Sequence, residues 1–244
     1  LSDIFRTPLY AFNVLSGGLI LPLVLILPNY LRSGMSMGSL IEMGRGIWNH
    51  IPFDDLYFAL AGIASGLVLG LFMGSIGSPN TSTFSREGKN IWLMQSLPIG
   101  AKEQLLGRVG AGLIIQMIIL TPILLLVLLL KPPVPLYLGL VLGSLLSGIF
   151  VSMLGLIIDV VRPKLHWDNP QEAMKQNFNV FLGMVLSWGY AALIGYIIYK
   201  MMDRILLGEI LIPALIIILS QLIIPVVLAV VFINYYDKLL LRMN

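Results

Sequence analysis

The chain of 244 residues contains no cysteine and few charged residues. The absence of cysteine excludes disulfides, iron–sulfur clusters and thiol nucleophiles. Charged residues make up 11% of the chain and hydrophobic residues 58%, whereas a soluble domain carries about 25% charged residues. Such a composition cannot cover a water-facing surface, so it indicates an integral membrane protein.

Catalytic and nucleotide-binding motifs are also missing. Gly88-Lys89 is followed by Asn90 and lacks the earlier glycine of a Walker-type phosphate loop, which excludes ATP binding by that route. No G-x-S-x-G, H-E-x-x-H or G-x-G-x-x-G motif appears in a strand–helix context. His50 and His166 are predicted on opposite sides of the membrane and cannot share a metal. We therefore expect no enzymatic activity in this chain, no cofactor and no metal.

Six apolar stretches are long enough to cross a bilayer, which takes about 20 helical residues. Their apolar cores contain no ionisable Asp, Glu, Lys, Arg or His, as the cost of burying charge in lipid demands. The sequence thus predicts an all-α bundle of six transmembrane helices that forms a single domain, residues 1–244. The predicted spans are residues 9–28, 56–78, 106–130, 135–158, 178–199 and 210–235.

The basic residues predict the orientation of the bundle. Basic residues favour the cytoplasmic side, and a cytoplasmic N-terminus places 10 of the 15 there and 5 outside. The inside set is Arg6, Arg86, Lys89, Lys102, Arg108, Arg162, Lys164, Lys175, Lys238 and Arg242. The outside set is Arg32, Arg45, Lys131, Lys200 and Arg204. Both termini, and the connections between spans two and three and between spans four and five, are therefore predicted in the cytoplasm.

Small residues recur every fourth position in three spans. Such stripes let helix backbones approach closely in lipid. Tight packing inside one bundle is the favoured interpretation, and a dimer seam or a helix that slides during transport are the alternatives. The stripes are Gly62, Gly66, Gly70 and Gly74 in span two, Gly139, Gly143 and Ser147 in span four, and Gly183, Ser187, Ala191 and Gly195 in span five.

Two amides and three prolines interrupt the spans. Gln116 and Gln221 lie near the middles of spans three and six, where a buried amide needs a partner. A hydrogen bond between helices is the favoured role, and a place along a substrate path is the alternative. Pro22, Pro122 and Pro225 are expected to kink their helices. Because no ionisable residue lies at membrane depth, a proton-coupled carrier is disfavoured.

The connection outside the predicted membrane, residues 29–55, has two interpretations. Ile41, Met43, Ile47 and Trp48 favour a segment on the membrane surface, and an ordered loop is the equal alternative. The chain begins with Leu1, which indicates processing or a place within a longer protein.

The first predicted cytoplasmic connection, residues 79–105, is the most polar segment. Between Ser85 and Ser96 its apolar residues fall on one side of a predicted helix. Pro98 must end that helix. Gly100 then marks the start of the next helix. The sequence thus predicts an amphipathic helix, a sharp stop and the entry to span three.

The second predicted cytoplasmic connection, residues 159–177, carries a turn signal. Asn169 can cap a helix that begins at Pro170, and this short helix is expected to run into span five. His166, Trp167 and Asp168 could serve acid–base chemistry, but a local turn is the favoured role.

Two motifs resemble one protein family. The stretch F-S-R-E-G-K-N-I-W-L-M-Q-S-L-P-I-G-A-K-E-Q-L-L-G-R at 84–108 and the stretch P-K-L-H-W-D-N-P-Q-E-A-M-K-Q-N at 163–177 resemble cytoplasmic loops of bacterial type-2 ABC transporter permeases. Together they cover about a sixth of the chain. Gly100 departs from the pattern, which has a small polar residue there. Several relatives contain two six-span halves, so this chain could correspond to a C-terminal half.

The resemblance implies a plasma-membrane permease of an exporter, whose ATPase is a separate chain docked on the first connection. Its implied coupling residues are Ser85, Arg86, Glu87, Gly88, Lys89, Trp92, Pro98 and Lys102. Its implied second-loop residues are Arg162, Lys164, Trp167, Asp168 and Lys175. For each charge a solvated face is the alternative, and for Trp92 an interfacial anchor.

The resemblance also implies partners. The expected partners are the ATPase, a second permease half or an identical subunit, and membrane lipid. Nucleic acid is not an expected partner. A membrane scaffold or assembly factor that does not transport is the alternative function. An enzyme acting on lipid is disfavoured, because it would need a cluster of polar residues at the membrane surface.

Overall fold

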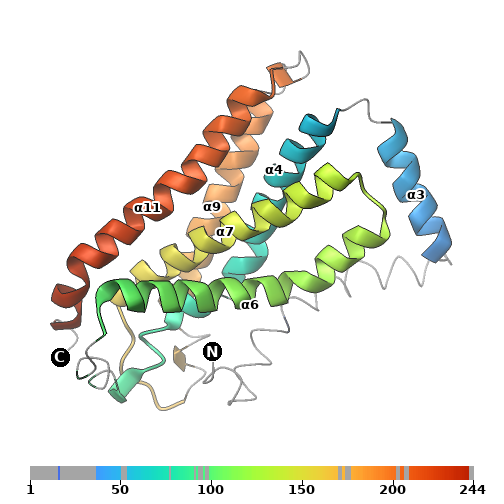
Figure 1. Cartoon of the computed structure of the whole chain (residues 1–244). Coiled ribbons are helices and arrows are strands. Elements are labelled where there is room, and N and C mark those ends of the chain that lie inside the picture. The colour runs from blue at the N-terminus through green and yellow to red at the C-terminus, as the bar shows by residue number, and fades with distance from the viewer. Residues whose placement is uncertain are drawn as a thin grey trace.

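The computed structural model describes residues 16, 37–50, 54–76, 78–90, 92, 96, 99–169, 172–173, 177–201, 204–205 and 209–241. Within these residues the fold is entirely helical (Figure 1). Five helices are long and apolar enough to cross a membrane, which fits a multi-pass membrane protein. The predicted first span, residues 9–28, lies outside the described residues except for Ser16, so five of the six predicted spans are seen.

The helix boundaries follow the predicted spans closely at most ends. Two helices extend beyond the prediction by more than a turn: the third span begins at Ala101 instead of residue 106, and the sixth ends at Leu241 instead of residue 235. The fourth span ends at Val161 instead of residue 158, so that Asp159 belongs to a helix and not to a loop. The α-helices are α3 (Met37–His50), α4 (Asp55–Ile76), α6 (Ala101–Leu129), α7 (Val134–Val161), α9 (Phe178–Lys200) and α11 (Leu211–Leu241), and two short 3₁₀ helices are η1 (Pro79–Ser82) and η2 (Gly88–Asn90).

The most extensive helix contact is between α4 and α7, and glycines make it possible. A Cβ atom added to Gly62 would overlap the carbonyl of Leu136, and one added to Gly66 would overlap that of Leu140. The relation is reciprocal, because Gly139 and Gly143 of α7 lie equally close to carbonyls of α4. The two backbones therefore approach more closely than any larger residue allows.

The next two glycines of α4 face side chains instead of backbone. Gly70 lies against the hydroxyl of Ser147, and Gly74 lies against the amide of Gln116 from α6. The Gln116 Nε2 donates to the carbonyl of Ser144 at 3.2 Å. Gln116 is thus buried with a hydrogen-bond partner on α7. Gly70 and Gly74 of α4, which have no side chains, leave the space that it occupies.

The small residues of α9 pack less evenly. Gly183 contacts the methyl group of Thr81, and Ser187 is buried. At the other end of the helix Gly195 is exposed and a Cβ atom there would meet nothing within 4 Å. Ala191 packs against a buried cluster with residues of α4, α7 and α11, so the stripe is packed up to this residue and open at Gly195.

The connection between the first and second predicted spans contains a regular helix, α3, in place of the loop alternative. The indole Nε1 of Trp48 donates to the carbonyl of Leu130 at 3.2 Å, and Gly44 lies against the same residue. Leu130 follows the last residue of α6, so α3 is attached to the turn between α6 and α7 (Figure 1). In that turn Lys131 has a positive φ of 48°.

Candidate functional site

The connection between α4 and α6 and the connection between α7 and α9 lie beside each other below one end of the bundle (Figure 1). We call residues 79–100 the first connection and residues 162–177 the second connection. Both were predicted on the cytoplasmic side, and both carry the motifs of the family resemblance. Their mutual contacts form a buried polar network.

The first connection begins inside the bundle. All four residues of η1 are buried, and η1 contacts α6, α7 and α9. Asn80 shows how this is achieved, because its Nδ2 donates to the carbonyl of Arg108 at 3.1 Å and to that of Ser152 at 3.4 Å. A side-chain amide therefore occupies the space between α6 and α7 and satisfies backbone oxygens of both helices.

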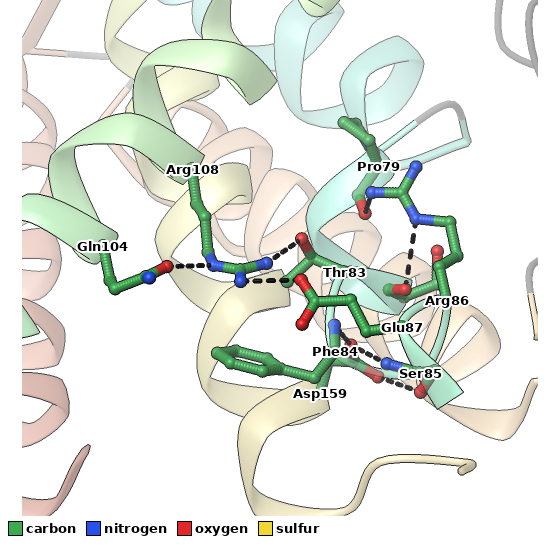
Figure 2. A network of polar contacts seen from close by, with 10 residues as sticks. Pro79, Thr83, Phe84, Ser85, Arg86, Glu87, Gln104, Arg108 and Asp159 are labelled. Carbon is green, nitrogen blue, oxygen red and sulfur yellow. Dashed lines mark hydrogen bonds and ion pairs between the residues drawn. The ribbon is translucent and has the colours of Figure 1, made fainter. Parts of the chain in front are cut away.

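Asp159 holds the next part of the connection. It lies in the last turns of α7 and is fully buried. Its Oδ2 accepts hydrogen bonds from the backbone N–H groups of Phe84 at 2.6 Å and Ser85 at 3.0 Å (Figure 2). Its Oδ1 accepts from the Ser85 hydroxyl and from the Asn179 Nδ2. All four donors are uncharged, so the carboxylate is held by oriented dipoles and not by an ion pair.

Ser85 joins the two connections. Its hydroxyl donates to Asp159 and accepts from the backbone N–H of Lys164 at 2.9 Å and from the Asn177 Nδ2 at 3.0 Å. Its carbonyl accepts from the Trp167 indole Nε1 at 2.8 Å. One small residue thereby contacts α7, the second connection and the residue that caps α9. We call Ser85, Asp159, Asn177 and Asn179 the Asp159 cluster.

Gly88 and Trp167 complete this contact. Gly88 has a φ of +49°, in the left-handed region that favours glycine. A Cβ atom at this position would lie 3.0 Å from the Trp167 Nε1. Both the backbone conformation and the indole above it therefore require glycine.

Arg108 attaches the first connection to α6. Its guanidinium donates to Thr83 Oγ1 at 2.6 Å and to Gln104 Oε1 at 3.1 Å, and it forms an ion pair with Glu87 at 2.8 Å (Figure 2). The same group lies over the ring of Phe84, 4.4 Å from its centre. Planar groups of this kind suit simultaneous hydrogen bonding and stacking.

The local structure differs from the predicted amphipathic helix. From Thr83 to Glu87 the chain forms turns, followed by η2, and Phe84 is buried in a cluster with α6, α7 and α11. Helix is assigned at Trp92 and Ser96. The prediction of a continuous helix from Ser85 failed because Asp159 accepts the N–H groups of residues 84 and 85 and thereby stabilises a turn.

Two of the four charged residues implied in coupling, Arg86 and Glu87, are turned inward. Glu87 is in the ion pair with Arg108, and its Oε2 is buried. Arg86 donates to the carbonyl of Ser82 at 3.3 Å and to that of Pro79 at 3.1 Å. Ser85 and Gly88 are also buried. In this conformation these four residues shape the connection, and the surface that a partner could reach lies further along the chain.

That surface follows η2. The Trp92 side chain is 58% exposed, and Ile99, Lys102 and Glu103 are exposed at the start of α6. Of the other predicted coupling residues, Pro98 and the side chain of Lys89 lie outside the described residues.

The second connection has a buried and an exposed part. Trp167 is partly buried against the first connection, whereas Asp168 is exposed. Arg162 is exposed over the ring of Phe178, and Lys164 lies 3.4 Å from Glu172. Lys175 lies outside the described residues.

The start of α9 corrects another prediction. Asn177 is extended, and its side chain accepts from the N–H of Asn179, so it caps a helix that begins at Phe178. The segment from Pro170 therefore does not run continuously into the fifth span. Asn169 accepts from the N–H of Glu172 at 2.9 Å through its carbonyl, as in a turn.

Sequence reasoning missed the residues that organise this site. Asp159 stood at the predicted boundary of a span, Asn177 ended the second motif without an assigned role, and Asn179 lay in no motif. The available signal was a single carboxylate directly after a long apolar run, where an unpaired charge is costly. Among the described residues, no group of His, Asp and Glu side chains could hold a metal ion.

The site holds two distant connections in one arrangement. Comparisons with models of protein families, with curated proteins and with solved structures find no match to this chain.

Proposed function

We propose that this chain is the transmembrane permease subunit of an ATP-driven ABC exporter in a bacterial plasma membrane. A separate ATPase binds its first connection, and a second permease half or an identical subunit completes the transporter. The proposal combines the multi-pass helical bundle with the two motifs that resemble type-2 permeases. It also accounts for the absence of a phosphate-binding loop in the chain.

The observation that carries the proposal is the attachment of the first connection at two independent points. The Asp159 cluster fixes it to α7 and α9, and Arg108 fixes it to α6. A mobile surface loop would need neither attachment. A loop that transmits movement from a motor to membrane helices needs both, because a flexible link would absorb the displacement.

The proposed contact surface consists of the exposed residues after η2. Trp92 supplies an apolar anchor, and Lys102 with Glu103 supplies charges that orient the partner. Ser85, Glu87 and Gly88 support this surface from within the chain. This division of roles differs from direct pairing of Arg86 and Glu87 with the ATPase.

Co-purification from native membranes tests the proposal. We expect an ATPase chain to accompany the wild-type protein, and Trp92→Ala combined with Lys102→Glu to reduce its recovery. Lys200→Glu is the matched control, because Lys200 is exposed and ends α9 at the opposite side of the bundle. Recovery of no ATPase from membranes that contain one would contradict the proposal. ATP-dependent transport in reconstituted vesicles would distinguish a permease from a scaffold.

A further inference from the structure

The short helix η1 is a polar segment inserted between three membrane-spanning helices. The helices α6, α7 and α9 each present one glycine to it, namely Gly112, Gly155 and Gly183. A Cβ atom on Gly112 would lie 2.6 Å from the Asn80 Nδ2, and one on Gly183 would lie 2.6 Å from the methyl carbon of Thr81. One on Gly155 would lie 2.9 Å from the backbone nitrogen of Thr81. We call these three glycines the glycine socket, because a larger residue at any of them would overlap η1.

The glycine socket lies within the spans. Its members are between five and eleven residues from the helix ends that adjoin the two connections, or about 8–16 Å along a helix. Polar groups at membrane depth are expensive and are commonly functional. Asn80 meets this cost with its two bonds to the carbonyls of Arg108 and Ser152. By contrast, neither side-chain polar atom of the buried Gln221 has a hydrogen-bond partner among the described residues.

The two ends of η1 are joined differently to the chain. Ser78 is extended, with a φ of −62° and a ψ of 114°, and Pro79 has no N–H to continue the helix of α4. At the other end Thr83 follows η1 directly and accepts from the Arg108 guanidinium at 2.6 Å. An extended residue between two helices can absorb a change of angle, so η1 can move relative to α4 more easily than relative to the turn that follows it.

We infer that η1 transmits displacement of the first connection to α6, α7 and α9, and that Asn80 and Thr81 position it for this. When the bound ATPase moves the exposed residues after η2, the attached turn carries η1 with it. Asn80 is bonded to α6 and α7, and Thr81 packs on α7 and α9. Movement of η1 therefore changes the spacing of three helices together. The inference rests on the proposed function and adds the route by which the ATPase rearranges the spans.

The absence of cysteine in the chain permits a direct test with Thr81→Cys and Gly183→Cys combined. A Cβ atom on Gly183 lies 3.8 Å from the Thr81 Cβ, within the range of about 3.5–4.5 Å found in disulfides. Copper phenanthroline should therefore form a disulfide in native membranes, measured as loss of both thiols toward a maleimide. We expect ATP hydrolysis by the co-purified complex to be lost on oxidation and restored by dithiothreitol.

This readout separates movement from a merely structural role. If η1 stayed still during the ATPase cycle, the disulfide would be tolerated, because it fixes a distance that the structure already has. The reduced protein serves as its own control for folding. Each single variant, Thr81→Cys or Gly183→Cys, should keep its ATP hydrolysis after the same oxidation.

A second pair of substitutions tests the contact itself without an ATPase. Gly183→Ala should lower the unfolding temperature of the purified chain by about 2–4 °C or more, because the new methyl group overlaps that of Thr81. Thr81→Ser removes this methyl group and keeps the hydroxyl that donates to the Ser78 carbonyl at 2.9 Å, so the combined variant should recover most of the loss. Gly189→Ala is the matched control on α9, since a Cβ atom there meets nothing within 4 Å.

ATP hydrolysis that continues after the disulfide has formed would overturn the inference. Failure of the disulfide to form would overturn it too, as would a combined variant no more stable than Gly183→Ala alone. Co-purification of an ATPase with the wild-type chain is measured first. If an ATPase co-purifies and the disulfide has no effect, the proposed function stands and the inference falls, whereas without an ATPase both fall.

Discussion

Ser85 and Asp159, 74 positions apart, form two hydrogen bonds, because the Asp159 carboxylate accepts from both the N–H and the hydroxyl of Ser85. The same carboxylate also accepts from the N–H of the preceding residue, Phe84. The last turns of α7 thereby determine the path of the first connection. The relationship leads to predictions about stability that do not depend on the proposed function.

Asp159→Asn should destabilise the protein by about 2–5 kcal/mol. The new amide would direct its own N–H groups at donors that now face a carboxylate oxygen, and buried donors left unpaired are costly. Thermal unfolding of the purified protein measures the change. Asp168→Asn is the control, because Asp168 is exposed and its loss should change the unfolding temperature little. Similar effects of both substitutions would contradict the assigned role.

Gly88→Ala should cost about 1–2 kcal/mol of stability. The cost has two sources, namely the positive φ and the contact with the Trp167 indole. Gly107→Ala is the matched substitution, since a Cβ atom there meets nothing within 4 Å and alanine favours the interior of a helix by about 1 kcal/mol. The two substitutions should therefore shift the denaturation midpoint in opposite directions.

Gly66→Ala should separate α4 from α7 and destabilise the bundle by about 1–3 kcal/mol, as overpacking does. The added methyl group would overlap the Leu140 carbonyl, which belongs to a helix backbone and cannot rotate away. Gly195→Ala in α9 should be neutral or stabilising, because space is open around it. Equal unfolding temperatures for the two variants would show that the close approach does not contribute to stability.

Arg108 and Glu87 should be energetically coupled. Their ion pair is 2.8 Å long, with side chains 14% and 28% exposed. A double-mutant cycle with Arg108→Met and Glu87→Gln should give a coupling free energy of about 1–2 kcal/mol. The same cycle on Arg204 and Glu209, 3.7 Å apart and more than half exposed, should give less than about 1 kcal/mol. A larger value for the exposed pair would refute the prediction.

The sequence was most informative where lipid imposes a simple rule. Length and hydropathy placed α9 within one residue of its observed ends, because a helix in lipid must continue until its ends reach polar surroundings. The glycines of α4 were identified as a packing face by spacing alone. Their partner, α7, could not be identified, since spacing describes one helix and contact requires two.

The connections were predicted less well, for a different physical reason. Their conformation depends on hydrogen bonds over long sequence separations, such as Trp167 to Ser85. Local propensity favoured a helix from Ser85, and a buried carboxylate from another helix overrode it. Glu87 likewise points inward because it forms an ion pair with Arg108. On sequence alone, Arg108 served only to predict the orientation of the bundle, so this ion pair was not predicted.

The Asn177 side chain reaches Ser85 across 92 positions of sequence, and this separation has a consequence for biosynthesis. Ribosomes add about 5–20 residues per second. Asn177 is therefore synthesised roughly 5–20 s after Ser85, and the hydrogen bond between them cannot form earlier. Until then the connection leaving α4 lacks the partners that define its shape. The first connection, which we propose binds the ATPase, thus reaches its final conformation late in synthesis. We expect that an incompletely synthesised chain does not yet present this binding surface to the ATPase.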